Sequence, residues 1–122
     1  MLTLASWYQR ENWRGKPMRV SRYAGRGLKK SQYGWGVVRC LAPDWELVKA
    51  YRSGLLSQEE YSVAYRRGLE ESWGEVQSWL SSLSPDEDIT LLCHEPEGKF
   101  CHRRLIGELV KRYRPDVPVD LR

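Results

Sequence analysis

Short apolar runs in this sequence have the length and spacing of β-strands. Residues 2–6 alternate apolar and polar side chains, which predicts a short first strand. Residues 89–93 form a nearly continuous apolar run, which is typical of a strand buried on both faces of a parallel sheet. Weaker patterns favour short strands at residues 18–21 and 37–38, and an edge strand at residues 117–121. We therefore expect a small, largely parallel sheet.

Elsewhere, apolar side chains recur every three or four residues, which predicts about four helices. One helix begins after Pro43-Asp44 and ends near Gly54. A capping box, Ser57 followed by Glu60, begins the next helix. The apolar stripes are Trp45, Val48 and Tyr51; then Tyr61, Ala64 and Tyr65; then Trp73, Val76, Leu80 and Leu83; then Leu105, Ile106, Leu109, Val110 and Tyr113.

Length and composition favour one α/β domain over residues 1–122. Trp45, Trp73 and Trp79 lie at helical spacing, so we expect them in the core. The longest apolar stretches have only a few residues, against the ~20 that a membrane helix needs, and no secretory signal is visible. Three cysteines without a Cys-x-x-Cys motif are typical of a reduced, cytoplasmic protein. We therefore expect a cytoplasmic protein with no membrane partner.

Charge is unevenly distributed along the chain. Residues 1–39, called the basic segment below, carry nine Lys or Arg and one acidic residue, a balance of +8. Residues 40–88 carry four basic and ten acidic residues, a balance of −6, and the whole chain is at +4. This asymmetry favours an anionic partner for the basic segment, although the acidic middle of the chain could equally lie against it.

Aromatic residues alternate with cations in the basic segment. Cations neutralise phosphates and rings stack on bases, so the pattern favours contact with single-stranded nucleic acid. The candidate contacts are Arg19, Arg26, Lys29 and Lys30. No known nucleic-acid-binding signature accompanies them. The alternative is that the rings belong to the core, with arginine stems packed over them.

Reactive side chains gather between residues 93 and 103, where a predicted strand ends and a predicted helix begins. In open α/β sheets this is the place where sites form. In one interpretation Cys93 or Cys101 is a nucleophile, and Glu95 or His102 transfers protons. The free N–H groups of the helix N-terminus stabilise a thiolate there.

Three other interpretations of these residues remain open. The first is a zinc or iron site, although the spacing is not a standard structural zinc pattern. Its candidate ligands are Cys93, Glu95, Cys101 and His102. The second is a phosphate-binding loop with Arg103, which the glutamates of the loop and the presence of Lys99 where a phosphatase loop needs an arginine both oppose. In the third, Cys93 is a small buried side chain and the loop is solvated.

Motifs at three places carry a family resemblance. Residues 91–95 read Leu-Leu-Cys-His-Glu, and Cys-His-Arg follows at residues 101–103. A second stretch runs from Leu41-Ala42-Pro43-Asp44-Trp45 to Tyr65, and a third is Val20-Ser21-Arg22. In these motifs the sequence resembles the family called domain of unknown function 488. The resemblance implies a small, Rossmann-like, three-layer α/β fold with the Cys-x-Glu and Cys-His-Arg residues near one end of the sheet. It implies no settled activity.

The leading hypothesis is a small enzyme or ligand-binding domain that acts on an anionic substrate of nucleotide or nucleic-acid type. The resemblance implies a catalytic group of Cys93, Glu95, Cys101 and His102, and a substrate-binding group of Ser21, Arg22 and Arg103. The alternatives are a non-catalytic module that binds nucleic acid or protein through the basic segment, and a metal-binding protein. No cofactor is indicated other than the zinc or iron of the metal interpretation.

Overall fold

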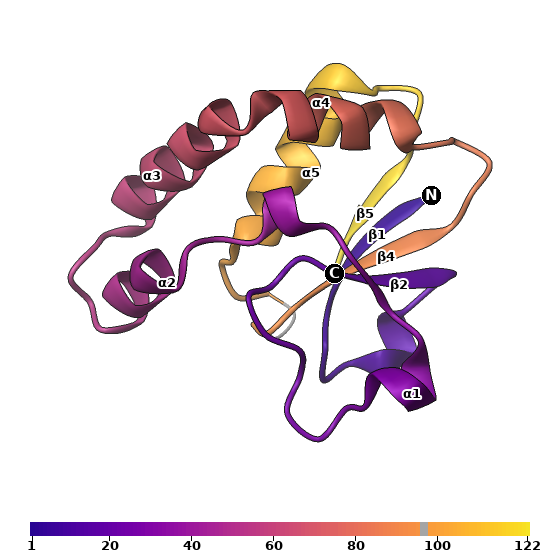
Figure 1. The fold of residues 1–122 in the computed structure, drawn as a ribbon, viewed down its shortest axis with the longest axis horizontal. Helices are drawn as coiled ribbons and strands as arrows, with labels where there is room; N and C mark the ends of the chain where they lie inside the picture. Colours follow the sequence, from indigo (N-terminus) through magenta and orange to yellow (C-terminus); the bar gives the residue numbers. More distant parts are fainter. Residues whose placement is uncertain (96–97) are drawn as a thin grey trace.

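The computed structural model describes residues 1–95 and 98–122 and contains a five-stranded parallel sheet (Figure 1). The strands are β1 (Leu2–Ser6), β2 (Lys16–Arg19), β3 (Gly36–Val37), β4 (Ile89–Cys93) and β5 (Val119–Leu121). They lie in the order β3-β2-β4-β1-β5, and each pair of neighbours is parallel. The predicted Rossmann-like α/β fold is confirmed, and every strand expected from the sequence is present.

Four of the five helices in the described residues, α2 to α5, follow the predicted stripes. They are α1 (Lys30–Tyr33), α2 (Trp45–Arg52), α3 (Gln58–Glu71), α4 (Trp73–Ser82) and α5 (His102–Tyr113), with short 3-10 turns η1 (Arg10–Asn12) and η2 (Arg39–Leu41). The capping box is confirmed, because Ser57 Oγ accepts from the Glu60 N–H and Glu60 Oε1 accepts from the Ser57 N–H. The sequence missed α1, since a single turn is too short to show an apolar period. Among the described residues, no helix is both long and apolar enough to span a bilayer.

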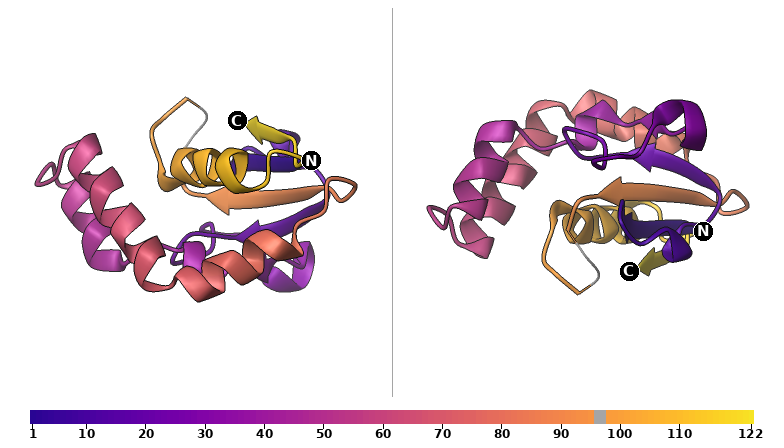
Figure 2. Two further views of the ribbon diagram at one scale, coloured as in Figure 1. Left: turned by 90° about the horizontal axis from the view of Figure 1, so that it is seen from above. Right: turned by 90° about the horizontal axis from the view of Figure 1, so that it is seen from below.

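The two faces of the sheet are covered in different ways, because strand side chains alternate between them. Leu2, Leu4 and Leu91 belong to the main core together with buried residues of α3, α4 and α5. Figure 2 shows α4 and α5 over this face, with parts of β2 and β4 visible between them in the view from above. Ala5 and Leu92 point to the opposite face and pack with tryptophans of the basic segment. The sheet is therefore the middle of three layers, of which the last is built from the segment that contains η1 and α1.

A close backbone contact joins the beginnings of β2 and β4. The Lys16 N–H donates to the carbonyl of Asp88 at 2.9 Å. The preceding residue, Gly15, has a φ of +72°, and a Cβ atom at this position would lie 2.0 Å from the same carbonyl oxygen. Only glycine satisfies both requirements here.

We expect Gly15→Ala to destabilise the protein more than Gly27→Ala. Gly27 has a φ of +81° with nothing within 4 Å of an added Cβ, so its substitution costs only the left-handed backbone, about 1–2 kcal/mol. Gly15→Ala adds the collision with Asp88. Urea unfolding followed by tryptophan fluorescence measures both losses, and equal losses would contradict this account of the contact.

Candidate functional site

A cavity of about 670 Å³ lies at the C-terminal ends of β1, β2 and β4. Residues that follow these strands form one side of it, and α2 with the beginning of α3 forms the other. Figure 2 shows the arrowhead of β4 directed toward the side of the molecule where α2 and α3 lie. This is the edge at which parallel α/β sheets bind ligands. The cavity is therefore the candidate site.

A disulfide between Cys93 and Cys101 lies in the cavity wall. Cys93 is the last residue of β4 and Cys101 is the N-cap of α5, and both are buried. The expectation of reduced cysteines therefore does not hold for this pair. Spacing along the chain could not reveal it, because only the fold brings the end of β4 beside the start of α5. Cys40 is the free cysteine, and burial raises the pKa of its thiol.

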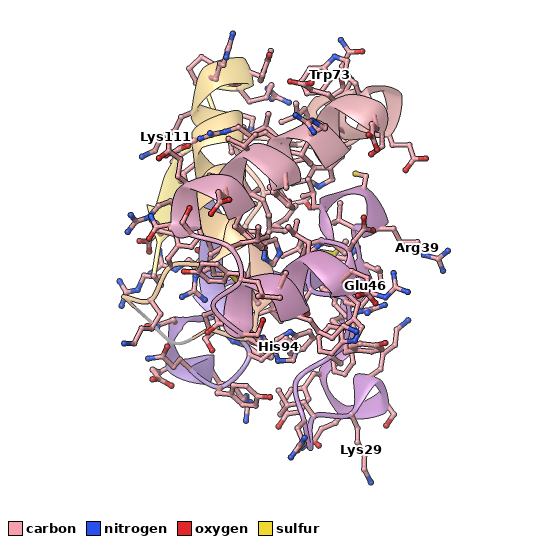
Figure 3. All side chains as sticks on the ribbon, turned by 90° about the vertical axis from the view of Figure 1, so that its left-hand side faces the viewer. Lys29, Arg39, Glu46, Trp73, His94 and Lys111 are labelled. Atoms are coloured by element: carbon pink, nitrogen blue, oxygen red, sulfur yellow. A yellow bond between two sulfur atoms is a disulfide. The ribbon has the colours of Figure 1, made fainter. Side chains whose placement is uncertain are left out.

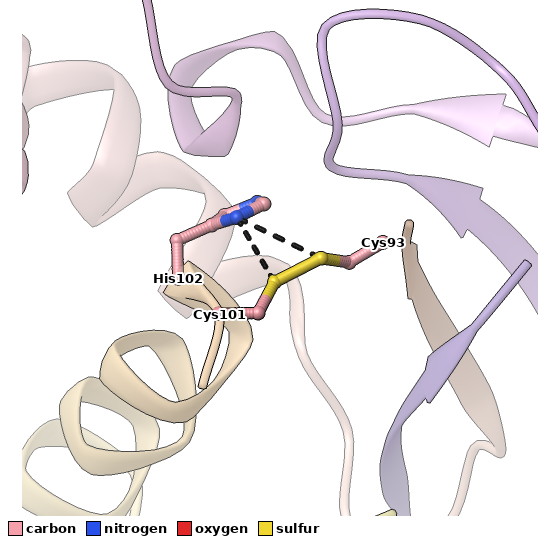
Figure 4. Close-up of side chains that lie close together, drawn as sticks. All are labelled: Cys93, Cys101 and His102. Carbon is pink, nitrogen blue, oxygen red and sulfur yellow. Dashed lines mark hydrogen bonds between the residues drawn. A yellow bond between two sulfur atoms is a disulfide. The ribbon is translucent and has the colours of Figure 1, made fainter. Parts of the chain in front are cut away.

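His102 lies against both sulfur atoms (Figure 4). Its Nδ1 is 3.3 Å from Cys101 Sγ and 3.8 Å from Cys93 Sγ, while its Nε2 is 2.8 Å from the carbonyl oxygen of Val20. A carbonyl only accepts, so Nε2 carries the proton and Nδ1 presents its lone pair to the sulfurs. Burial lowers the pKa of His102 to about 4, and nearby Arg103 and His94 act in the same direction. The imidazole is therefore neutral at neutral pH.

Cys93, Cys101 and His102, called the Cys–His cluster below, could hold a metal ion. Their potential ligand atoms all lie within 4.8 Å of one another. Glu95, the fourth ligand considered from the sequence, stands outside this group. Its carboxylate lines the cavity and pairs with Arg52, with Oε1 3.1 Å from Nη2. Within the described residues, the structure therefore brings together three of the four candidate ligands.

Arg103 does not line the cavity. Its side chain is almost fully buried, and its Nη1 donates to the carbonyl oxygen of Glu95 at 2.6 Å. This bond ties the segment after β4 to the first turn of α5. In this structure Arg103 therefore supports the wall of the site rather than offering its charge to a ligand.

A family model described as the "Active DUF488-N3 subclade" matches residues 3–114. The chain belongs to the DUF488 family. The resemblance seen in the sequence is confirmed, and the match covers the Cys–His cluster and the rest of the cavity lining. Neither the curated proteins nor the solved structures gave a match.

Ser21 of this DUF488 protein lies in the cavity wall, but its hydroxyl is already engaged. It donates to the carbonyl of Tyr23 and accepts from Trp7 Nε1 at 3.0 Å. The neighbouring Arg22 is exposed and lines the cavity. Of the two substrate-binding candidates after β2, Arg22 is thus the one with a charged group available to a ligand.

Two aromatic residues of the α2 stripe line the cavity, and of these Tyr51 also packs against the main core. Trp45 is 36% exposed, and its ring meets Tyr23 edge to face at 5.8 Å. Tyr51 lies one turn and a half further along α2 and meets Phe100 at 5.8 Å. The stripe on α2 was therefore recognised correctly, but its face covers the cavity. Trp73 and Trp79 pack against the main core, as predicted.

Two further cavity residues carry groups that the sequence did not single out. His94 Nε2 is 2.8 Å from the carbonyl oxygen of Tyr23, and its Nδ1 is 3.5 Å from Tyr8 Oη. Arg52 reaches the cavity from the last turn of α2. The sequence shows Arg52 only as a cation near the end of a predicted helix, and the tertiary structure turns that helix toward the strand ends.

The basic segment of the DUF488 protein is divided between several roles. Arg19 donates to the carbonyls of Ser21 and Arg22, so its guanidinium holds the turn after β2. Arg26 lines the cavity. Lys29 and Lys30 are exposed, and Figure 3 shows Lys29 projecting outward from one end of the molecule, away from His94.

The rings of the basic segment are mostly structural. Trp7 and Trp35 are buried on one face of the sheet with Trp13 and Tyr33 packed beside them, and Arg10 stacks 4.6 Å from the Tyr33 ring centroid. In residues 1–95 and 98–122, no Lys or Arg side chain of the basic segment pairs with an acidic side chain of residues 40–88. The N-terminal ammonium of Met1 pairs with Asp88 at 3.2 Å, so among the described residues the Lys and Arg charges of this segment, and not its terminal charge, are without such ion pairs.

We expect Ser21→Ala to lower the free energy of unfolding by about 1–3 kcal/mol, because it leaves the buried indole N–H of Trp7 without its acceptor. The loss should shrink in a Trp7→Phe background, where the donor is absent. Ser53→Ala is a control, since the exposed Ser53 hydroxyl donates to the Ala50 carbonyl, and we expect it to change stability by less than about 0.5 kcal/mol. Unchanged stability in Ser21→Ala would instead mean that the hydroxyl is not structural.

Proposed function

We propose that this DUF488 protein binds a nucleotide-like ligand, an aromatic ring that carries a phosphate group, and acts on it with the groups of the cavity wall. The observation that carries this proposal is the presence of several aromatic side chains, and of arginines without a carboxylate partner among the described residues, in one cavity at the strand ends. Its volume of about 670 Å³ lies within the range of about 300–1,000 Å³ that small-molecule sites occupy.

The aromatic part of the ligand has several rings to contact. Trp45 and Tyr51 project from α2, and Tyr23 and Phe100 lie next to them across the cavity. Stacking on rings of this kind stabilises a bound base by about 1–3 kcal/mol and tolerates any base, because every base has a π-face. This wall supports recognition of a flat aromatic group.

The charge of the cavity supports a phosphate monoester. Arg22, Arg26 and Arg52 line it with Glu95, so three guanidinium groups face one carboxylate. Glu95 pairs with Arg52, whereas no carboxylate among the described residues pairs with Arg22 or Arg26. A phosphate monoester carries a charge of about −1.5 to −2 at pH 7 and matches the remaining two positive charges. Guanidinium groups also bind phosphate oxygens in pairs, which adds orientation to affinity.

The groups we assign to the chemical step are Cys93, Cys101, His102 and Glu95. All four residues line the cavity; Cys93, Cys101 and His102 are buried, and Glu95 pairs with Arg52. A phosphate that binds Arg52 competes with Glu95 for the guanidinium, and this competition frees the carboxylate to accept a proton. The word "active" in the description of the matching subclade also supports an enzyme.

We expect adenosine monophosphate to bind more tightly than adenosine or inorganic phosphate, because only the nucleotide contacts both the aromatic residues and the arginines of the cavity. Quenching of the tryptophan fluorescence that is lost in Trp45→Phe reports binding at the cavity, and the other three nucleoside monophosphates test base preference. Arg22→Gln should weaken binding about tenfold, as loss of one charged hydrogen bond does. Arg66→Gln is the matched control, because Arg66 is exposed on α3 and pairs with Glu108 outside the cavity.

Two results would overturn this assignment. The first is equal affinity in Arg22→Gln, Arg26→Gln and Arg66→Gln, or no binding of any nucleotide. The second is tight binding of single-stranded oligonucleotides that Lys29→Gln and Lys30→Gln weaken but Arg22→Gln does not. That pattern would favour a non-catalytic nucleic-acid-binding module, and its salt dependence would report the number of phosphates contacted.

We also expect turnover of a bound nucleotide to disappear in Cys93→Ser and to persist in Cys40→Ser, since Cys40 lies outside the cavity. Mass spectrometry of the nucleotide after incubation with reduced protein measures this. Turnover at the wild-type rate in Cys93→Ser would remove the Cys–His cluster from the chemical step while leaving the binding assignment intact.

A further inference from the structure

We propose that the Cys–His cluster, once its disulfide is reduced, is a zinc site with three protein ligands and a fourth position that faces the cavity. The ligands are Cys93, Cys101 and His102. The inference deepens the proposed function. It rests on that function only for the statement that the fourth coordination position of the zinc ion faces a bound nucleotide. Zinc binding itself can be measured in the absence of any nucleotide.

The orientation of His102 is that of a metal ligand. Its Nε2–H donates to the carbonyl of Val20 at 2.8 Å, which leaves the Nδ1 lone pair directed at both sulfurs. Histidines that bind metals almost always donate their other N–H to a carbonyl, carboxylate or water in this way. The bond therefore holds the ring in the tautomer and direction that coordination needs.

The distances from His102 to the two sulfurs fit a shared ion. With Zn–S near 2.3 Å and Zn–N near 2.05 Å, a tetrahedral centre separates nitrogen and sulfur by about 3.6 Å. The observed Nδ1–Sγ distances are 3.3 Å to Cys101 and 3.8 Å to Cys93. Coordination thus needs little movement of the imidazole relative to either cysteine.

The backbone positions of the two cysteines also suit coordination. Their Cα atoms lie 7.6 Å apart, wider than the roughly 4.4–6.8 Å that most disulfides span. Two thiolates on one tetrahedral zinc ion are about 3.8 Å apart, given Zn–S near 2.3 Å. Reduction of the disulfide allows the sulfurs to take this spacing while the end of β4 and the start of α5 stay in place.

Charge favours the ion as well. Cys93, Cys101 and His102 are all buried, and two thiolates alone would be costly in that environment. Together with a neutral imidazole they cancel the charge of Zn²⁺. All three residues line the cavity, so a bound nucleotide lies on the side where a fourth ligand would enter. A zinc ion with an open position polarises a phosphoryl or carbonyl oxygen or lowers the pKa of bound water.

The test is zinc uptake by the full chain after reduction with a phosphine, which reduces the disulfide without binding the metal as a thiol reagent would. We expect one zinc ion per chain in the reduced protein and none in the disulfide form. Loss of a ligand in Cys93→Ser, Cys101→Ser or His102→Gln should weaken affinity at least tenfold in a chelator competition. Cys40→Ser is the matched control and should keep one ion, because Cys40 lies outside the cluster.

Two measurements guard against misfolded variants. Cobalt added to the reduced wild-type protein should give the intense visible bands of a tetrahedral thiolate site, with no substitution involved. Zinc should also protect Cys93 and Cys101 of the folded wild-type chain from alkylation, and should leave the partly exposed Cys40 as reactive as it is without the metal. Binding of less than a tenth of a zinc ion per reduced chain would overturn the proposal. So would zinc that protects Cys101 from alkylation in Cys93→Ser as fully as it does in the wild-type chain.

The proposal of a zinc site and the proposal of a nucleotide site can be refuted independently of each other. Arg22→Gln should lose affinity for adenosine monophosphate and keep one zinc ion, because Arg22 touches no ligand atom of the cluster. Stoichiometric zinc without nucleotide binding would leave the zinc site standing and remove the proposed substrate class. Nucleotide binding by a reduced protein that takes up no zinc would do the reverse.

Discussion

The hydrogen bond from His102 Nε2 to the carbonyl of Val20 joins segments 82 residues apart and determines much of the site. It holds the first turn of α5 against the end of β2, next to the end of β4. It also settles which imidazole nitrogen faces the sulfurs. Without this bond the ring could rotate, and the cysteines would face the cavity without a directed lone pair beside them. Since the bond is buried, water cannot take the place of either partner, and loss of one partner would leave the other without a hydrogen bond in a low-dielectric environment.

The parallel sheet explains why so many chemically capable groups meet in one place. Parallel strands end at a common edge, so the segments after β1, β2 and β4 converge there even though other elements separate them in the sequence. The long excursion from β3 to β4 supplies α2 and α3, which return over the same edge and close the cavity. Part of the positive charge of the basic segment therefore lies at the cavity, which Arg22 and Arg26 line. Arg19 is instead hydrogen-bonded to backbone carbonyls, and Arg10 stacks on the Tyr33 ring.

Tryptophan serves two purposes in this fold, and local pattern does not separate them. Trp7 and Trp35 fill the space beneath one face of the sheet, while Trp45 stands half open to the cavity. All three read as large apolar side chains in the sequence. Helical periodicity correctly placed Trp45, Val48 and Tyr51 on one face of α2. What covers that face is decided by the distance between α2 and the strand ends, which no local pattern records.

By itself the sequence determined the strands and all helices longer than one turn, because each depends on the spacing of neighbouring side chains and on caps such as Ser57 with Glu60. It also identified the segment from Cys93 to Arg103 as the chemically richest part of the chain. Only the tertiary structure decided that Cys93 and Cys101 touch each other and His102, that Glu95 turns instead to Arg52, and that Arg103 is buried as a support. Those outcomes depend on contacts between segments far apart in the chain. They also depend on which protein groups replace water around each side chain when the chain folds. The local periodicity of the sequence determines neither.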